Sequence, residues 1–268
     1  MHSATFVLST GRCGTQWLAE KLGATFGDLL TVTHEPLHNE YRPRLMLGLR
    51  TPHRLDLESR ETILRHVEGI GRGLETRPYV ECGHPCWSAL PYLIDRLGER
   101  LRIIHLVRHP IPTALSWLTQ SAYVPPLLPH LQEKVLLSPF DDGVAFPEYR
   151  ERWASLHPYE KCLYYWAEVN AFGLRLERET SSPWLRLTFE QLFFGDLETP
   201  SLPGFLGLPE RPGLLEQRTE VVDKYRFLPS LGVPDLDLRA SHPAIAGIAG
   251  ELGYDHLVLP TSPGPERK

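Results

Sequence analysis

The sequence lacks three features: an excess of basic residues, a dense set of cysteines and a long apolar run. Its 28 lysine and arginine residues are outnumbered by 33 acidic ones, and the formal net charge of −5 argues against a general nucleic-acid binder. Four cysteines in 268 residues are too few for a disulfide framework. No segment approaches the length of a transmembrane helix. The N-terminal residues also lack the basic region of a signal peptide and lead into an apolar segment by Phe6.

These absences predict a reduced, cytoplasmic protein that has neither a nucleic acid nor a membrane as its partner. The sequence contains no signal for an oligomeric state. A hydrophobic content of 42% over 268 residues is typical of one soluble domain with a sizeable core, so we expect a single domain over 1–268. Short apolar, β-rich segments alternate with segments of helical periodicity, which favours an α/β fold with a mostly parallel sheet. The expected strands cover Thr5–Leu8, Leu29–His34, Pro78–Cys82, Ile103–Val107 and Trp184–Thr188.

A glycine-containing loop joins the first of these strands to a helix that begins near Thr15. Gly11 and Gly14 allow the chain to turn sharply and expose backbone N–H groups, which point the same way as the dipole of the following helix. Arg12 adds a positive charge. The loop is not a Walker A motif, because that motif has a lysine after its second glycine. The pattern predicts a phosphate-like or sulfate-like ligand over Arg12 to Thr15, and a glycine turn without a ligand is the alternative.

A second motif follows the fourth strand. Arg108 comes directly after the strand, Pro110 suits the first turn of the next helix, and Ser116 lies about two turns into that helix. A guanidinium can bind a phosphate through two parallel hydrogen bonds, and a hydroxyl can donate a third. The pair therefore predicts a second phosphate site. A structural salt bridge for Arg108 and a surface position for Ser116 form the alternative.

Together these stretches resemble the sulfotransferases that use 3′-phosphoadenosine 5′-phosphosulfate (PAPS). The run Arg-Cys-Gly-Thr-Gln-Trp-Leu from Arg12 resembles their 5′-phosphosulfate loop, and Arg108 with Ser116 eight residues later resembles their 3′-phosphate motif. His109 departs from the aspartate or asparagine usual at its position. The resemblance covers roughly residues 5–210. It implies a three-layer αβα fold like that of P-loop NTPases, PAPS as the donor, adenosine 3′,5′-bisphosphate (PAP) as the product, and no metal.

The resemblance also implies a set of donor-binding residues in the first loop, at the second motif and in a basic stretch further on. These are Arg12, Cys13, Gly14, Thr15, Gln16, Trp17, Arg108, Ser116, Lys224 and Arg226. Arg12 would also act in catalysis by neutralising the leaving bridge oxygen. The Arg-Lys-Gly run that usually marks the C-terminal loop of cytosolic members is absent, so a solvated charge run is the alternative for Lys224 and Arg226.

Three side chains are candidates for the base that takes the acceptor proton. His34 and Glu35 follow the second strand and His84 follows the third, and the C-terminal ends of parallel strands line the ligand crevice. We expect His34 and Glu35 near Arg12 if the second strand neighbours the first. Glu35 ranks first, because the Glu-Pro step resembles bacterial and carbohydrate-type members more than the cytosolic steroid and phenol enzymes. A surface glutamate before a proline turn is the alternative for Glu35, and a merely structural histidine is the alternative for His84.

A metal site is not expected at the Cys82, His84 and Cys86 cluster, because three ligands packed this closely cannot all reach one tetrahedral zinc without strain. Residues 121–157 are rich in proline and aromatic residues, which predicts a lid or acceptor wall, with a surface insertion as the alternative. Residues 260–268 are proline-rich and polar, and we expect a disordered tail.

The sequence does not identify the acceptor. The aromatic- and proline-rich segment 121–157 suits a small molecule or a glycosylated or lipophilic natural product better than a long anionic polysaccharide, which would need a basic cleft. The resemblance implies transfer to a hydroxyl or amine of a small molecule, a carbohydrate or a natural product. Two other functions stay open. A kinase-like P-loop NTPase with a degenerate loop would need Mg²⁺ and a loop lysine. A non-catalytic nucleotide-binding module would keep Arg12, Arg108 and Ser116 but would not depend on Glu35.

Overall fold

Five parallel strands form the centre of the fold in a computed structural model, which describes residues 2–48, 61–194, 201–211 and 232–254. The strands are β1 (Ala4–Leu8), β2 (Thr31–His34), β3 (Tyr79–Cys82), β4 (Leu101–Val107) and β5 (Trp184–Thr188). Their order in the sheet is β2-β3-β1-β4-β5, and each neighbouring pair runs parallel. All five expected strands are present, and the expectation of a mostly parallel sheet is confirmed.

The second strand is not the neighbour of the first, so the condition attached to the placement of His34 and Glu35 is not met. β3 lies between them and pairs with both, through Val80 opposite Thr5 on one side and Val32 on the other. The physical reason lies in burial. All four residues of β3 are buried, as an inner strand requires, whereas Thr31 and His34 of β2 are exposed, which only an outer strand tolerates.

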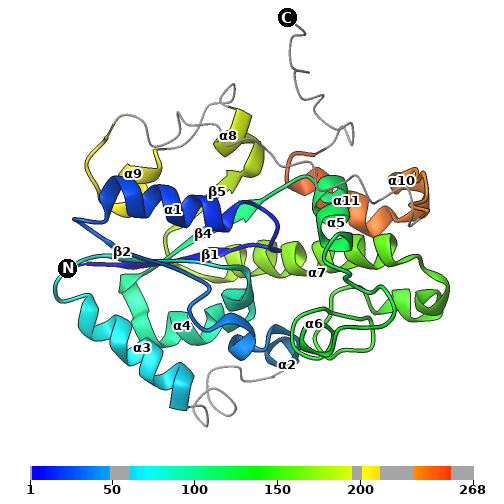
Figure 1. Cartoon of the computed structure of the whole chain (residues 1–268), viewed down its shortest axis with the longest axis horizontal. Helices are drawn as coiled ribbons and strands as arrows, with labels where there is room; N and C mark the ends of the chain where they lie inside the picture. The colour runs from blue at the N-terminus through cyan, green and yellow to red at the C-terminus, as the bar shows by residue number, and fades with distance from the viewer. Residues whose placement is uncertain (1, 49–60, 195–200, 212–231, 255–268) are drawn as a thin grey trace, which may run out of the picture.

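Helices cover both faces of the sheet (Figure 1). One face carries α1 (Thr15–Phe26), α8 (Phe189–Phe194) and α9 (Leu202–Leu206), and the other carries α3 (Glu61–Gly73), α4 (Leu90–Leu97) and α7 (Pro158–Glu179). Successive strand side chains point to opposite faces. Val7 accordingly packs in one core with Leu18 of α1, while Phe6 belongs to a second core with Ile63 of α3. This is the three-layer αβα arrangement expected from the sequence.

The helix boundaries follow local sequence signals. α1 begins at Thr15, as predicted, and α7 begins one residue before the expected Tyr159. α5 (Pro110–Leu118) has Pro110 at its first position and His109 as its N-cap. The remaining elements are short, except for α11. They are η1 (His38–Tyr41), α2 (Pro43–Leu47), η2 (His84–Ala89), η3 (Gly98–Arg100), α6 (Pro129–Gln132), η4 (Pro147–Glu151), η5 (Trp153–Ser155), α10 (Leu238–Ser241) and α11 (Pro243–Glu251).

The proline-rich segment 121–157 contains only α6, η4 and η5, but it is anchored to the rest of the chain. Tyr123, Leu137 and Tyr149 are buried in the same core as α7. The buried carboxylate of Glu168 in α7 accepts hydrogen bonds from two backbone N–H groups of the segment, those of Ala145 at 2.7 Å and of the next residue at 2.9 Å. The segment therefore has a defined path against α7. The tail expected at 260–268 lies outside the described residues.

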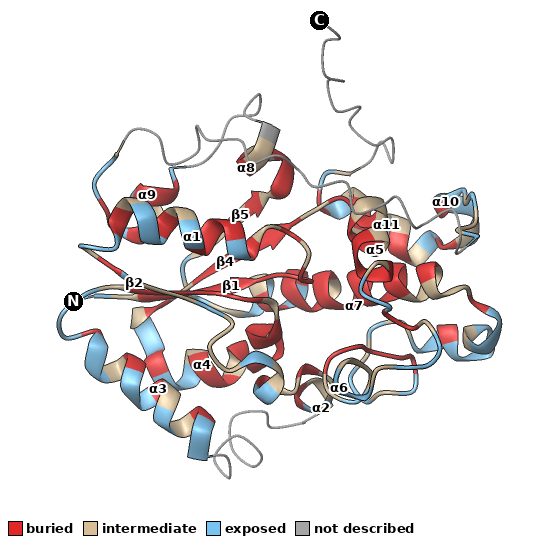
Figure 2. Cartoon of the chain, in the orientation of Figure 1, coloured by how far each residue is buried: buried red, intermediate tan, exposed pale blue. Residues whose placement is uncertain are grey.

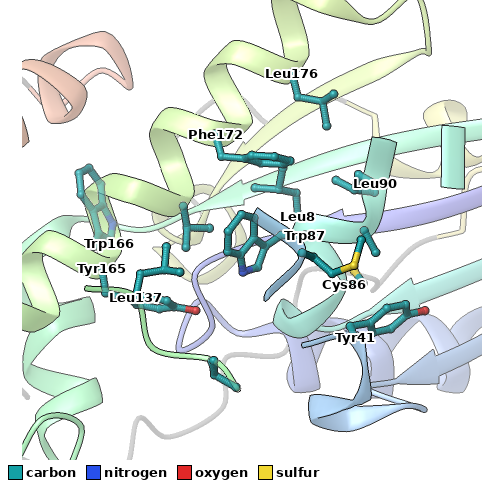
Figure 3. Close-up of a cluster of buried hydrophobic side chains, with 14 of the residues drawn as sticks. Leu8, Tyr41, Cys86, Trp87, Leu90, Leu137, Tyr165, Trp166, Phe172 and Leu176 are labelled. Atoms are coloured by element: carbon teal, nitrogen blue, oxygen red, sulfur yellow. The ribbon is translucent and has the colours of Figure 1, made fainter. Parts of the chain in front are cut away.

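A dense aromatic core lies between β1, η2 and α7. Buried residues, red in Figure 2, concentrate on the strands and on the helix faces that meet them. Figure 3 shows Trp87 of η2 at the centre of this cluster, facing Phe172 of α7. Their ring centroids lie 4.9 Å apart at an angle of 70°. Because Trp87 follows His84 by three residues, this core fixes the position of the polypeptide that carries His84.

Within the described ranges, no group of three or more histidine, cysteine, aspartate or glutamate side chains is arranged to hold a metal ion. Cys82 and Cys86 are both buried free thiols, and they belong to different cores on the two faces of the sheet. None of the helices in the described part of the chain is both long enough and apolar enough to cross a membrane.

Candidate active site

Hydrogen bonds join the two motifs found in the sequence. The Arg12 Nε donates to the Ser116 hydroxyl oxygen over 2.9 Å, and the Arg108 guanidinium donates to the Arg12 carbonyl over 2.8 Å. Trp117, next to Ser116, donates its indole N–H to the Thr10 carbonyl over 3.0 Å. These bonds clamp the loop after β1 onto the start of α5. They bring the two predicted phosphate-binding motifs into one site at the C-terminal edge of the sheet.

Arg108 is held in a defined orientation. Its guanidinium carbon lies 4.0 Å from the centroid of the Phe189 ring, a favourable cation–π contact. Its carbonyl accepts the indole N–H of Trp166 over 2.9 Å. The Arg108 Nε is buried and has no hydrogen-bond partner among the residues that the structure describes. A buried guanidinium N–H with no acceptor fits an anionic ligand, because leaving such a donor unsatisfied is costly.

The other loop residues differ in what they contact. Cys13 is fully buried, and burial raises the pKa of its thiol to about 11. Its sulfur lies 3.2 Å from both the Thr10 hydroxyl and the Gly11 carbonyl, so it holds the loop together as a neutral thiol. Gln16 is exposed and bonds Glu20 one turn along α1 over 3.0 Å.

Three candidate bases lie beside this loop. The His84 Nδ1 is 2.8 Å from the Glu35 carboxylate, and the His34 Nε2 is 3.9 Å from the same carboxylate oxygen. The His34 Nε2 also lies 3.3 Å from the Thr15 hydroxyl at the start of α1. The structure therefore brings together all three candidates and the first loop, although β2 and β1 are not neighbours.

Two glycines make this close packing possible. Gly11 has a φ of +73°, and a Cβ there would lie 2.9 Å from the His84 Cγ and 3.0 Å from the Trp117 ring. Gly83 has extended backbone, and a Cβ there would lie 2.7 Å from the Glu35 Cγ. Any larger residue at either position would push the carboxylate and the imidazole away from the loop.

The electrostatics of the cluster separate the roles of Glu35 and His84. Burial alone would raise the pKa of Glu35, but the hydrogen bond and charge of His84, together with the charge of His34, outweigh burial and lower that pKa to about 2. Glu35 is thus a stable anion. The acidic partner favours the His84 tautomer with its proton on Nδ1, which leaves a lone pair on Nε2. That Nε2 is buried without a hydrogen-bond partner in the described ranges.

His34 is less suited to take a proton. Burial lowers its pKa, and this effect exceeds the opposing influence of the Glu35 charge. Its Nε2 already contacts both Thr15 and Glu35.

Backbone strain marks the same region, because Arg12 and Glu35 both adopt the left-handed conformation, with φ values of 61° and 46°. Strained non-glycine residues cluster at functional sites, where the surrounding structure maintains them.

Several residues at this site had no role assigned from the sequence. Phe189 lies under the Arg108 guanidinium, and Phe193 packs on Trp17 with ring centroids 4.6 Å apart. Glu190 accepts the backbone N–H of His109 over 3.3 Å. One signal was available: the Phe189-Glu190 step directly follows the last strand, at the same edge of the sheet as the two motifs. Lys224 and Arg226, expected in the donor site, lie outside the described residues.

The comparisons with known proteins concern the fold. No protein-family model matches the chain, and no curated protein does either. Among solved structures, the chain is similar to the sulfotransferase domain from the curacin biosynthetic pathway, with a TM-score of 0.53 and 18% sequence identity over 95% of this chain and 98% of that chain.

Two further solved structures are also similar at 18% identity. The sulfotransferase domain of the Synechococcus PCC 7002 olefin synthase has a TM-score of 0.42 and matches over 98% of this chain and 90% of that one. A sulfotransferase from Alicyclobacillus acidocaldarius has a TM-score of 0.43 over 94% and 96%. The first similarity, at 0.53, supports the sheet topology described above. The chain has the sulfotransferase fold, as the sequence motifs led us to expect.

Proposed function

We propose that this protein is a PAPS-dependent sulfotransferase that moves a sulfuryl group to a hydroxyl or amine of its acceptor. One observation carries the proposal: the Arg108 guanidinium donates to the Arg12 carbonyl, which joins the 5′-phosphosulfate-like loop to the 3′-phosphate-like motif. The donor carries anionic groups at both its 5′ and 3′ ends. A site with two arginines, one on each motif, is suited to an anion of this kind.

Each motif has its own task in the proposed donor site. The backbone N–H groups of Gly14, Thr15 and Gln16 lie at the N-terminus of α1, where a phosphosulfate is favoured. Arg12 neutralises charge on the leaving bridge oxygen. Arg108 binds the 3′-phosphate. Its buried, unsatisfied Nε is the feature that fits this group.

Sulfuryl transfer mainly requires in-line positioning and stabilisation of charge on the donor oxygens, by analogy with phosphoryl transfer. The acceptor oxygen forms a bond to sulfur while the bond from sulfur to the 5′-phosphate oxygen breaks. The acceptor proton moves to the free Nε2 of His84. The Glu35 carboxylate accepts the hydrogen bond from the Nδ1–H of His84 and stabilises the imidazolium that forms. In this proposal Glu35 is a positioning residue, whereas the sequence ranked it first as the base.

The acceptor is proposed to be a small molecule, a carbohydrate or a natural product. Supporting this is the segment 121–157, which carries aromatic residues such as Phe140, 60% exposed. The segment 121–157 also contacts the polypeptide that follows Glu35, through a hydrogen bond that Arg44 of α2 donates to the Asp141 carboxylate over 2.5 Å.

We further propose a cytoplasmic location, since all four cysteines are buried free thiols and suit a reducing compartment.

Calorimetry with the purified protein tests the donor site. PAP is titrated in the absence of metal, and ATP with Mg²⁺ is titrated in parallel. We expect tight, metal-independent binding of PAP and much weaker binding of ATP. A preference for ATP with Mg²⁺ would overturn the proposal and favour a kinase-like NTPase. Binding of PAP with no transfer from PAPS to any acceptor in a phenol, sugar and amine panel would instead favour a non-catalytic nucleotide-binding module.

A further inference from the structure

His109 occupies a buried position directly beside Arg108. It is 1% exposed and forms the N-cap of α5, where its Nδ1 accepts the backbone N–H of Ile111 over 3.2 Å. Burial, with a smaller effect from the Arg108 charge, lowers the pKa of this imidazole to about 4, so the ring is neutral at pH 7. A neutral imidazole has one proton. Because Nδ1 is an acceptor, the proton of His109 is on Nε2.

The Nε2–H donor of His109 has no acceptor among the residues that the structure describes. The carboxylate of Glu190 bonds other groups: one oxygen accepts the His109 backbone N–H, and the other accepts the Tyr254 hydroxyl over 2.7 Å. The Tyr254 ring meets the imidazole edge-on, with centroids 5.3 Å apart. The backbone and Nδ1 of His109 are thus satisfied, whereas its Nε2 is not.

Two consecutive residues therefore carry buried N–H donors without an acceptor in the described part of the chain, the Arg108 Nε and the His109 Nε2. A buried donor without an acceptor is costly, and folded proteins avoid it except where a ligand or ordered water completes the bond. The hydroxyl of Ser116 accepts from Arg12 and keeps its own proton to donate. A tetrahedral anion has several terminal oxygens that accept hydrogen bonds from donors of this kind.

We propose that the His109 Nε2 donates a hydrogen bond to the phosphate monoester that Arg108 binds. The inference rests on the proposed function, in which that group is the 3′-phosphate of the donor. An asparagine or aspartate at this position would cap α5 equally well, but its side chain ends at the capping atoms and offers no ring N–H beyond them. Histidine supplies the cap and a donor from one side chain. It therefore strengthens the preference for a 3′-phosphorylated nucleotide.

Two substitutions separate the cap from the ring donor. His109→Asn keeps an oxygen that can cap α5 and removes the Nε2–H. His109→Gln places an amide N–H near the position of Nε2 and gives up the favoured cap. The same change in an exposed histidine of α6, His130→Asn, is the matched control. Affinities for PAP, AMP and inorganic phosphate are measured by calorimetry, with the thermal midpoint recorded for every variant.

We expect His109→Asn to weaken PAP binding about tenfold to a hundredfold, the range for a hydrogen bond to a charged group, and to leave AMP binding and the thermal midpoint unchanged. His109→Gln should recover part of the PAP affinity, and His130→Asn should bind PAP as the wild type does. We also expect the wild type to bind inorganic phosphate weakly, and His109→Asn to bind it more weakly still. That result would show that His109 contacts the phosphate rather than the nucleoside.

Unchanged PAP affinity in His109→Asn, or an equal loss for PAP and AMP, would overturn the inference and leave the proposed function intact. Failure of the proposed function has a different signature, because the wild-type protein itself would then not prefer PAP over AMP.

Discussion

The Arg12 Nε donates to the Ser116 hydroxyl oxygen over 2.9 Å, linking residues 104 positions apart in the chain. The sequence paired Ser116 with Arg108 as a second ligand for one phosphate. The structure instead connects Ser116 to the cation of the first loop, while Arg108 reaches back to the Arg12 carbonyl. Arg12 of the first motif thus contacts both Ser116 and Arg108 of the second motif. A change in one motif should therefore affect the other.

Ser116→Ala tests this shared arrangement. The variant removes the acceptor that orients Arg12, so binding at the 5′ end of a nucleotide should weaken as well as binding at the 3′ end. We expect calorimetry to show about a tenfold loss of affinity for both AMP and PAP. Ser155→Ala, at an exposed position in η5, serves as the control. A loss confined to PAP would show that Ser116 serves the 3′-phosphate alone.

Arg108→Ala should weaken PAP binding by roughly 1.5–3 kcal/mol, because it removes hydrogen bonds to a charged group. Arg108→Lys keeps the positive charge but loses the planar fork and the close stacking on Phe189, so it should recover only part of the affinity. Equilibrium binding of PAP measures both. If donor affinity does not change in Arg108→Ala, the 3′-phosphate is not bound at this position.

Replacing the candidate bases one at a time distinguishes their roles. His84→Gln should reduce turnover by about 10²–10⁴-fold while PAP affinity stays near the wild-type value, because the proton acceptor is lost and the donor site remains. Glu35→Gln should cause a smaller loss, since its amide oxygen can still accept the hydrogen bond from Nδ1–H. His34→Gln should change turnover least. A larger loss in Glu35→Gln than in His84→Gln would make Glu35 the base.

The pH dependence of turnover adds a second readout for the same assignment. With a pKa of about 2, Glu35 stays ionised throughout the accessible range, so a Glu35 base would give no acidic limb above about pH 4. An imidazole base must be neutral to act. Activity should therefore be lost in acid if an imidazole is the base. A flat profile down to pH 4 would contradict His84 as the base.

His105 should make the stability of the protein depend on pH. Burial in β4, only partly opposed by a hydrogen bond with Asn170, lowers the pKa of this imidazole to about 3, against about 6.5 in an unfolded chain. Between these values the unfolded state binds the extra proton. The free energy of unfolding therefore falls as the pH falls, by at most about 1.4 kcal/mol per pH unit for this group.

The measurement is urea unfolding of the wild type and His105→Gln at pH 7.5 and pH 5. The glutamine cannot titrate but can still donate to Asn170. Its deficit in stability relative to the wild type should shrink in acid, by up to about 2 kcal/mol between the two pH values. An unchanged difference between the two proteins would mean that His105 is not held neutral in the native state.

Local elements could be predicted from the sequence because their signals are local. Apolar β-rich segments, the glycine loop and the proline at the start of α5 each act over a few residues. They located β1, β4 and β5 to within one or two residues and placed the start of α1 at Thr15. The spacing of Arg108 and Ser116 indicated an anion site, and the fold comparison is consistent with the family that this spacing resembles.

Only the tertiary structure decided which residues meet. The placement of β3 between β1 and β2 depends on how completely each strand is buried, and burial depends on helices that are distant in sequence. The same placement puts the polypeptide after β3 beside the end of β2, so Glu35 contacts His84. The sequence by itself determined the elements and the chemistry at their ends. The packing of the sheet determined their partners, because hydrogen bonds across about a hundred residues have no local signal.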